Sequence, residues 1–147
     1  MMINFNIAKK FIEPFVTISA AEKSPEIINL AKSIDRITDG WQIQGDKDGR
    51  KVMLSVYQII GFHTVGKNVV CQTEDEEYRV SQRIYELKQL LPEKLFVPVS
   101  SSEILNISSI RDLTLTKTGS YQINLMNGQT TFTSRRYMKL LKERFLR

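Results

Sequence analysis

The stretch LTLTKTGSYQINLMNGQTTFT, residues 113–133, indicates the fold class most clearly, because it reads as short strands joined by tight turns. Strand-like runs stand at 113–116, 121–125 and 129–133. In the first two, apolar residues alternate with polar ones, which is typical of half-buried strands. Asn127-Gly128 is the clearest turn signal in the chain, and Thr118-Gly119-Ser120 is a second turn. The stretch therefore predicts antiparallel hairpins.

The same pattern continues toward the N-terminus. Further strands are expected at 41–44, 50–56, 57–62, 68–73, 78–80 and 96–99. Asp48-Gly49 is a strong hairpin signal between the first two. A polar loop, His63 to Lys67, is expected between the third and the fourth, and the acidic run 74–77 reads as an exposed turn.

Three segments have the features of helices. Ser24 is an N-cap candidate before Pro25, and apolar residues then recur at helical spacing, so a helix is expected over 25–39. Ser81 is expected to cap a second helix that ends at Pro92, and Ser134 to cap the last helix. One face of that last helix would carry Tyr137, Leu140, Leu141 and Phe145.

The strands outnumber the helices and follow one another in hairpins, which predicts an α+β fold with antiparallel sheets rather than a βαβ fold. About eight to ten short strands and three helices are expected. Alternating residues at Ile3–Ile7 and a run at Phe15–Ile18 predict two strands before the first helix. Residues 1–44 are thus expected to form a strand–strand–helix extension to a domain at 45–147.

The 147 residues carry 21 basic and 16 acidic side chains, for a net charge of +5. The excess is confined to the last third: residues 94–147 hold nine basic and three acidic residues, or +6, whereas 1–44 sum to zero and 45–93 to −1. This asymmetry indicates a polyanionic partner for the C-terminal end, and solvated surface is the alternative interpretation.

No residue pattern indicates catalysis. His63 is the only histidine and Cys71 the only cysteine, so the familiar Cys/His zinc sites are excluded. Cys71 is expected to be a half-buried structural thiol within a strand. Nucleotide-binding and hydrolase motifs are absent from the sequence, and so are membrane spans and a signal peptide. We expect no enzyme, metal or cofactor, and a soluble protein of the reducing cytoplasm.

A basic patch is expected at the start of the last helix. Arg135 and Arg136 would occupy its first turn, where the helix dipole disfavours each exposed cation by about 0.3–1 kcal/mol, and Lys139 lies one turn further on. A helix selected for stability alone would carry acidic residues there. Arginine forms bidentate hydrogen bonds with phosphates and guanine edges, so the patch suits nucleic acid.

Segments in a fixed order along residues 42–147 resemble the LytTR-type DNA-binding domain. The strand 57–62, the loop with Lys67-Asn68 and the leucine-rich helix resemble its first half. FVPVSSSEILN, residues 96–106, resembles its central segment with the closing Ile-Leu-Asn. Gly119–Ile123 and Ser134–Tyr137 resemble its last strands and final helix. Residues 1–44 are similar to the extension of short, stand-alone members.

The resemblance implies an elongated, mostly antiparallel fold of about ten short strands in small sheets, and a bacterial transcriptional regulator that reads DNA through loops. Contacts would come from the loop after the first core strand, the segment before Ile-Leu-Asn, and the start of the last helix. With the basic patch, the expected DNA-binding residues are Thr64, Lys67, Asn68, Ser100, Ser101, Ser102, Arg135, Arg136 and Lys139.

The sequence departs from the family pattern at Ser101, where a basic or amide side chain is usual, and at the apolar Val97–Val99. Serine discriminates poorly between bases, so a weaker or different preference is expected at that half of the site. The resemblance further implies a homodimer on repeated half-sites of double-stranded DNA and a regulatory membrane-protein partner. Control by a receiver domain is not expected, because 1–44 is too short for one. The alternative is a protein- or ligand-binding adaptor whose basic C-terminal third contacts an acidic partner.

Overall fold

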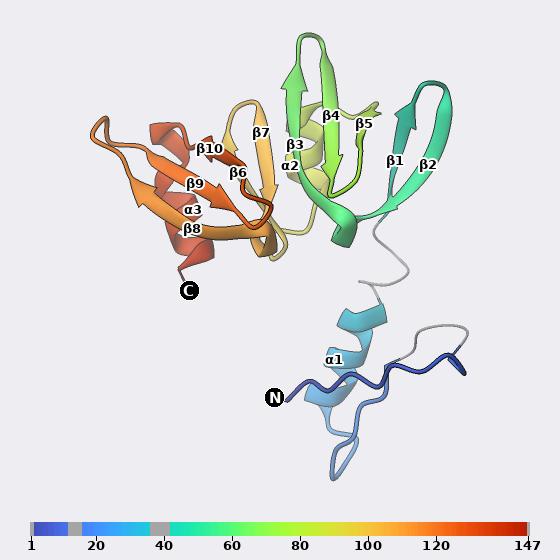
Figure 1. Cartoon of the computed structure of the whole chain (residues 1–147). Coiled ribbons are helices and arrows are strands. Elements are labelled where there is room, and N and C mark those ends of the chain that lie inside the picture. The colour runs from blue at the N-terminus through green and yellow to red at the C-terminus, as the bar shows by residue number, and fades with distance from the viewer. Residues whose placement is uncertain (1, 12–15, 36–41, 147) are drawn as a thin grey trace.

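The computed structural model describes residues 2–11, 16–35 and 42–146, and two antiparallel sheets dominate it (Figure 1). The strands of the larger sheet, sheet A, are β1 (Gln42–Lys47), β2 (Arg50–Ser55), β3 (Ile59–Val65), β4 (Asn68–Thr73), β5 (Glu77–Val80), β6 (Phe96–Ser100) and β7 (Glu103–Asn106). Those of the smaller sheet, sheet B, are β8 (Ile110–Leu115), β9 (Tyr121–Leu125) and β10 (Thr130–Phe132). The predicted α+β class and the elongated antiparallel fold are confirmed.

Three α-helices and three short 3-10 helices complete the described chain. The α-helices are α1 (Pro25–Asp35), α2 (Ile84–Leu90) and α3 (Met138–Phe145). The 3-10 helices are η2 (Val56–Gln58), η3 (Ile107–Ser109) and η4 (Arg135–Tyr137). Sheet A has the strand order β2-β1-β5-β4-β3-β7-β6 and sheet B the order β10-β9-β8, so β5 lies between β1 and β4.

The tight turns follow the residues that the sequence offers. Asp48 and Gly49 between β1 and β2 have φ values of 53° and 81°, the left-handed pair that a type I′ hairpin turn requires. Asp46 accepts a hydrogen bond from the Gly49 N–H at 3.1 Å and closes this turn. The β9–β10 turn contains the expected Asn127-Gly128, with Gly128 at a φ of 87°.

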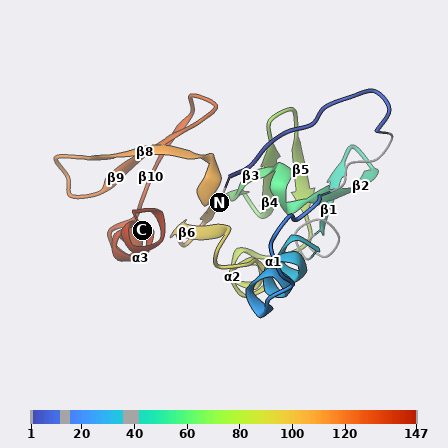
Figure 2. The same ribbon diagram turned by 90° about the horizontal axis from the view of Figure 1, so that it is seen from below.

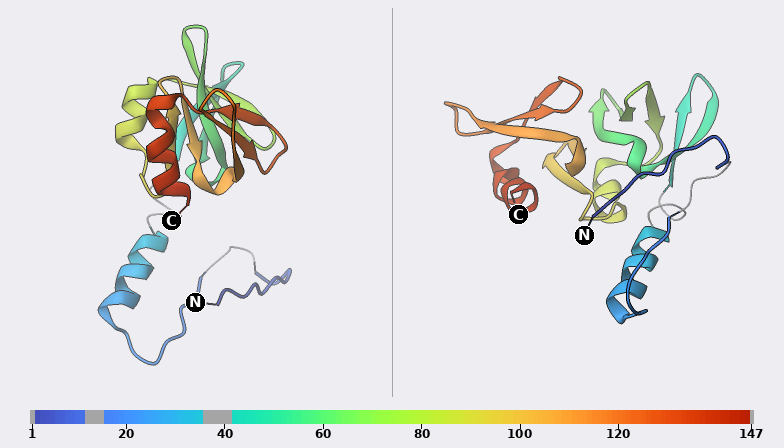
Figure 3. Two further views of the ribbon diagram at one scale, coloured as in Figure 1. Left: turned by 90° about the vertical axis from the view of Figure 1, so that its left-hand side faces the viewer. Right: turned by 60° about the horizontal axis from the view of Figure 1, so that its bottom comes forward.

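Helices α2 and α3 lie on one side of the sheets (Figure 3). Helix α2 packs on β3 and β7, while α3 packs on β6 (Figure 2). Strands β6 and β7 are therefore buried on both faces: Phe96 and Ile104 belong to the core under α2, and Val97 and Leu105 to a second core formed with sheet B and α3. The segment 96–106 thus joins the two halves of the domain.

Strand β7 is held against β3 by two features that local pattern does not reveal. The Asn106 side chain is buried, donates to the Ile59 carbonyl at 3.0 Å and accepts from the Ser108 N–H at 3.0 Å. A Cβ on Gly61 would come within 2.7 Å of the Ile104 carbonyl oxygen, so the close approach of the strands requires glycine there. The asparagine of the Ile-Leu-Asn motif is therefore structural.

One predicted helix start is wrong, and another is right only in part. Helix α2 begins at Ile84 after Arg83, whose N–H is accepted by Glu86 at 3.1 Å, and Ser81 lies in a bend before it. Ser134 does occupy the N-cap position of the last helical segment, but its side chain makes no capping bond, and Arg135 and Arg136 lie in η4, a 3-10 turn that leads into α3. The arginines are therefore not in the first turn of an α-helix, and the dipole argument applies to them only weakly.

The N-terminal region differs from its prediction in part. Helix α1 is confirmed, with the Ser24 Oγ accepting from the Ile27 N–H at 3.3 Å. The strand predicted at Ile3–Ile7 is wrong, because these residues have no strand partner and form coil. Val16–Ile18 is also coil, while Phe15 and residues 36–39 of the predicted helix lie outside the described residues. The predicted boundary between residues 44 and 45 falls inside β1.

Candidate nucleic-acid interface

Two backbone hydrogen bonds join the three segments that the sequence singled out. The Thr64 N–H, near the end of β3, donates to the Ser102 carbonyl in the β6–β7 turn at 3.1 Å. The Ser134 N–H, directly before η4, donates to the Val99 carbonyl of β6 at 2.9 Å. Segments about 35 residues apart in sequence therefore form one continuous surface. Main-chain bonds thus set the spacing of the three segments.

The β3–β4 connection is shorter than the predicted loop. Thr64 lies within β3 and pairs with Val69, and Asn68 is the first residue of β4, so only Gly66 and Lys67 form the turn. Gly66 has a φ of 61°, as the first central position of a type II′ turn requires. Thr64, Lys67 and Asn68 are all exposed, and the two-residue turn presents the Lys67 ammonium at the hairpin tip.

The β6–β7 turn is built from three serines. The Ser100 Oγ accepts the Ser102 N–H at 3.2 Å and lies 3.3 Å from the Ser102 Oγ, a local turn typical of serine. Ser101 and Ser102 are exposed at the tip. The turn therefore offers hydroxyls and no charge, next to Thr64.

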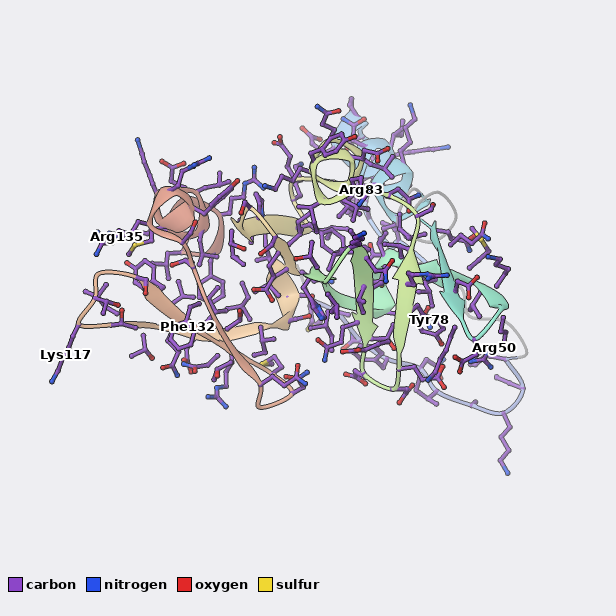
Figure 4. The ribbon with its side chains drawn as sticks, turned by 90° about the horizontal axis from the view of Figure 1, so that it is seen from above. Arg50, Tyr78, Arg83, Lys117, Phe132 and Arg135 are labelled. Carbon is purple, nitrogen blue, oxygen red and sulfur yellow. The ribbon has the colours of Figure 1, made fainter. Side chains whose placement is uncertain are left out.

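The η4 segment supplies the cations. Arg135, Arg136 and Lys139 are exposed, the first two in η4 and the third in the first turn of α3 (Figure 4 labels Arg135). The Arg135 Nη2 donates to the Thr118 carbonyl at the β8–β9 turn, at 2.9 Å. Tyr137, the last residue of η4, links this segment to α2, because its hydroxyl accepts a hydrogen bond from the Lys88 Nζ at 2.8 Å.

Two basic residues at this surface were not predicted. The Arg83 Nη1 donates to the Lys67 carbonyl at 3.2 Å, which places a guanidinium beside the β3–β4 turn. Lys117 is exposed next to Thr118, the residue that Arg135 contacts, and Figure 4 shows Lys117 and Arg135 at the same end of the molecule. Arg83 is 16 residues from Lys67 in sequence, so only the pairing of β3, β4 and β5 brings them together.

Acidic residues gather at the opposite end of β3 and β4. Glu76 in the β4–β5 turn forms ion pairs with Lys47 at 3.3 Å and Arg50 at 3.0 Å. Its pKa is held below the usual range, chiefly by the hydrogen bond from the Tyr78 hydroxyl and next by Lys47. This turn, predicted as merely exposed, therefore ties β5 to the β1–β2 hairpin. Glu74 and Asp75 of this turn are exposed, so carboxylates lie at this end of β3 and β4, together with the two cations that pair with Glu76, whereas Lys67 and Arg83 lie at the other end.

The cysteine and the histidine, the remaining side chains with reactive groups, lie within strands of sheet A. Cys71 is completely buried rather than half-buried, and burial raises the pKa of its thiol to about 12, which leaves it unreactive. His63 is half-buried on β3 opposite Glu103 of β7. Among residues 2–11, 16–35 and 42–146, no group of three or more His, Cys, Asp or Glu side chains could hold a metal ion. No helix in this part of the chain could span a membrane.

Comparisons with known proteins name a DNA-binding domain and transcriptional regulators. The profile of the LytTr DNA-binding domain matches residues 49–146. Over 144 residues, 98% of this chain and 97% of the relative, an uncharacterized HTH-type transcriptional regulator from Staphylococcus aureus strain MSSA476 is 29% identical. Another uncharacterized HTH-type transcriptional regulator, from Staphylococcus aureus strain NCTC 8325, is 28% identical over 98% of this chain and 97% of its own length.

A solved structure shares the fold. It is the LytTr DNA-binding domain of a putative methyl-accepting/DNA response regulator from Bacillus cereus, with a TM-score of 0.67 and 14% sequence identity. The match covers 70% of this chain and 94% of that one.

Proposed function

The chain belongs to the LytTr DNA-binding domain family, and from that premise we propose that it is a sequence-specific transcriptional regulator. It reads duplex DNA through the β3–β4 turn, the β6–β7 turn and η4. The observation that carries this proposal is the pair of backbone hydrogen bonds, Thr64 to Ser102 and Ser134 to Val99, which places the three segments on one surface. The family is one of DNA-binding regulators, and we propose no enzymatic activity.

The chemistry of the surface assigns different roles to its parts. Arg135 carries a planar fork of donors that fits the O6 and N7 atoms of guanine, so it is the base-reading residue. Lys67 is a point charge at a hairpin tip and contacts phosphate, as do Arg136 and Lys139. Thr64, Asn68 and the hydroxyls of Ser100–Ser102 complete the surface with groups that both donate and accept hydrogen bonds.

Arg83 extends the phosphate-binding surface beyond the residues that the sequence indicated. Its guanidinium donates to the Lys67 carbonyl through Nη1 and therefore both fixes the turn and adds a cation beside it. Lys117 adds a further exposed cation next to Thr118, the residue whose carbonyl Arg135 contacts. Arg83 directly precedes α2 and Lys117 lies in the β8–β9 turn, so neither cation is on a helix that enters a groove. Helices α2 and α3 are separated by five strands and do not form a helix-turn-helix pair.

The regulator works in the cytoplasm as a homodimer on repeated half-sites, with residues 1–41 in assembly or signal reception. A regulatory membrane protein is the partner that such a segment would receive. Support comes from the composition of the segment: residues 1–41 carry no net charge and, where described, contain no buried side chain.

Selection of bound sequences from a random duplex pool tests the proposal. One enriched motif, bound about 10³-fold or more tightly than random duplex, is the expected result. The same selection with Arg135→Ala is the matched control and should lose information at one base position. Equal binding to all duplexes would refute sequence-specific regulation and favour an adaptor whose basic end contacts an acidic protein.

A further inference from the structure

A groove of about 790 Å³ opens at the acidic end of the domain. It is lined by the start of β3 and η2, the β4–β5 turn, η3 and the β9–β10 turn. Ile59 and Thr73, which pair at this end of the β3–β4 hairpin, both line it. Lys67 lies at the other end of the same hairpin, roughly 20 Å away at the rise of an extended strand. The groove is therefore separate from the proposed DNA surface.

The groove has an apolar wall and an acidic rim. Met126 and Tyr57 leave 68% and 45% of their surface exposed there, and Leu54 and Leu125 lie behind them. Exposed Glu74 and Asp75 form the rim, and the groove lining contains no basic residue. Carboxylates repel DNA phosphates, so the groove does not bind nucleic acid. It fits an apolar peptide followed by cations.

The N-terminal segment, residues 2–10, has that chemistry. Ile3, Phe5 and Ile7 alternate with polar residues and leave 70%, 85% and 87% of their surface exposed. Lys9 and Lys10 follow directly, and the segment contains no acidic residue. Apolar side chains so completely exposed in succession mark a binding element rather than ordinary surface. Within one chain the segment lies on the same side of the domain as α1, below both sheets in Figure 1 and in the left view of Figure 3.

We propose that the groove of one copy of this chain binds residues 2–10 of a second copy. Ile3, Phe5 and Ile7 pack on Tyr57 and Met126, and the two lysines lie over Glu74 and Asp75. The exchange is reciprocal, so it produces a closed two-fold dimer in which each chain both donates and receives a segment. The inference rests on the proposed function for its dimer, and it leaves both DNA surfaces free because the groove lies at the far end of β3 and β4.

Disulfide capture in the full-length chain tests which segment occupies the groove. Ile7→Cys and Met126→Cys proteins are purified separately, mixed and oxidised; buried Cys71, with a thiol pKa raised to about 12, stays unreactive. A mixed disulfide dimer on a denaturing gel is the expected result. Ile7→Cys mixed with Phe132→Cys is the control, since Phe132 is also exposed, at 53%, but lies on β10 outside the groove, and it should remain monomeric.

The double variant Ile7→Cys/Met126→Cys separates the two ways of filling the groove. Covalent dimers support exchange between copies. Thiol loss at the mass of one chain would show that the segment occupies its own groove, and absence of any disulfide would show that the groove takes another partner. Either result would overturn the proposal.

A charge swap provides a second, independent test. Lys9→Glu/Lys10→Glu should shift the light-scattering mass from two chains toward one, and adding Glu74→Lys/Asp75→Lys should restore the dimer. All four positions are exposed, so folding is not at stake. Dimers that ignore the first pair, or a second pair that fails to rescue, would refute the exchange. A monomer that still selects one DNA motif separates this failure from failure of the regulator proposal.

Discussion

Residues 2–35 and residues 42–146 use similar apolar patterns with opposite results. Helix α1 and the segment before it contain no buried side chain in their described residues, whereas every buried residue of the described chain lies after Gln42. An isolated helix of 11 residues is marginal in water. Helix α1 therefore depends on its Ser24 cap and on packing of its apolar face against another protein surface. The amphipathic pattern therefore predicts which elements form. Whether an element enters a core depends on whether another apolar surface of the protein packs against it.

The largest expected contrast is in stability. Phe62→Ala empties the centre of the core under α2 and should lower the free energy of unfolding by about 3–5 kcal/mol. Phe5→Ala removes the same side chain from the N-terminal segment and, in protein diluted until the proposed exchange dimer dissociates, should change it by no more than about 0.5 kcal/mol. Urea unfolding followed by circular dichroism measures both. A loss above 1 kcal/mol in Phe5→Ala, which is about the centre of the mutational distribution, would show that the segment belongs to the core.

The next contrast is in DNA reading. Arg135→Ala should weaken binding to the selected duplex by about 1–3 kcal/mol and relax preference at one base position. Lys23→Ala removes a cation from the N-terminal region and should leave both unchanged. Titrations on cognate and scrambled duplexes measure the pair. Equal loss on both duplexes in Arg135→Ala would make this arginine a phosphate clamp and move base reading to residues 64–68 or 100–102.

Salt dependence sharpens the same comparison. Lys67→Ala should weaken binding to all duplexes by the same factor. It should also lower the slope of the log binding constant against log salt concentration by about 0.9, because one phosphate contact is lost. Lys32→Ala, in the last turn of α1, changes net charge equally and should keep the slope. The slopes are obtained from binding curves at several salt concentrations. A change in slope with Lys32→Ala would place the N-terminal region on the DNA.

The smallest expected effect is a dependence of stability on pH. Burial raises the pKa of Glu103, although the Thr131 hydroxyl that donates to it at 2.6 Å opposes the shift. A carboxyl with a raised pKa in the folded state contributes its stability below the unfolded-state value, near 4.3, and loses it as pH rises through the folded value. Glu103→Gln should therefore gain stability relative to the wild type as pH rises from 4 to 7.

The control for this pH profile lies again in the N-terminal region. Glu22→Gln removes an exposed carboxylate and should follow the wild-type profile across the same range. Thermal unfolding at closely spaced pH values measures the three proteins. Parallel profiles for Glu103→Gln and the wild type would show that Glu103 is solvated rather than buried.

Local signals in the sequence were sufficient for much of the architecture. Asp48-Gly49 and Asn127-Gly128 form turns because few residues tolerate the required φ values, and that preference does not depend on the rest of the fold. Ser24-Pro25 begins α1 for a similar reason, since the cap is made within four residues. The concentration of basic charge in residues 94–147 also follows from sequence alone.

Tertiary structure decided what distant segments do to one another. The Ile3–Ile7 alternation resembles a strand, yet a strand requires a partner edge, and pattern cannot supply one. Pairing of β3 with β4 shortened a predicted five-residue loop to Gly66-Lys67, since strand ladders continue until the turn stops them. Nor could spacing place Arg83 beside Lys67.

The proposed DNA surface shows the same division. Arg135 and Arg136 were recognisable as a basic patch, because charge and residue type are written in the chain. The bonds from Thr64 to Ser102 and from Ser134 to Val99 were not, because they depend on the order of strands in sheet A and on the docking of η4 against β6. Side-chain chemistry is a local property that the sequence determines by itself, whereas the position of one loop against another is set by burial of surfaces far apart in the chain, and only the folded structure contains it.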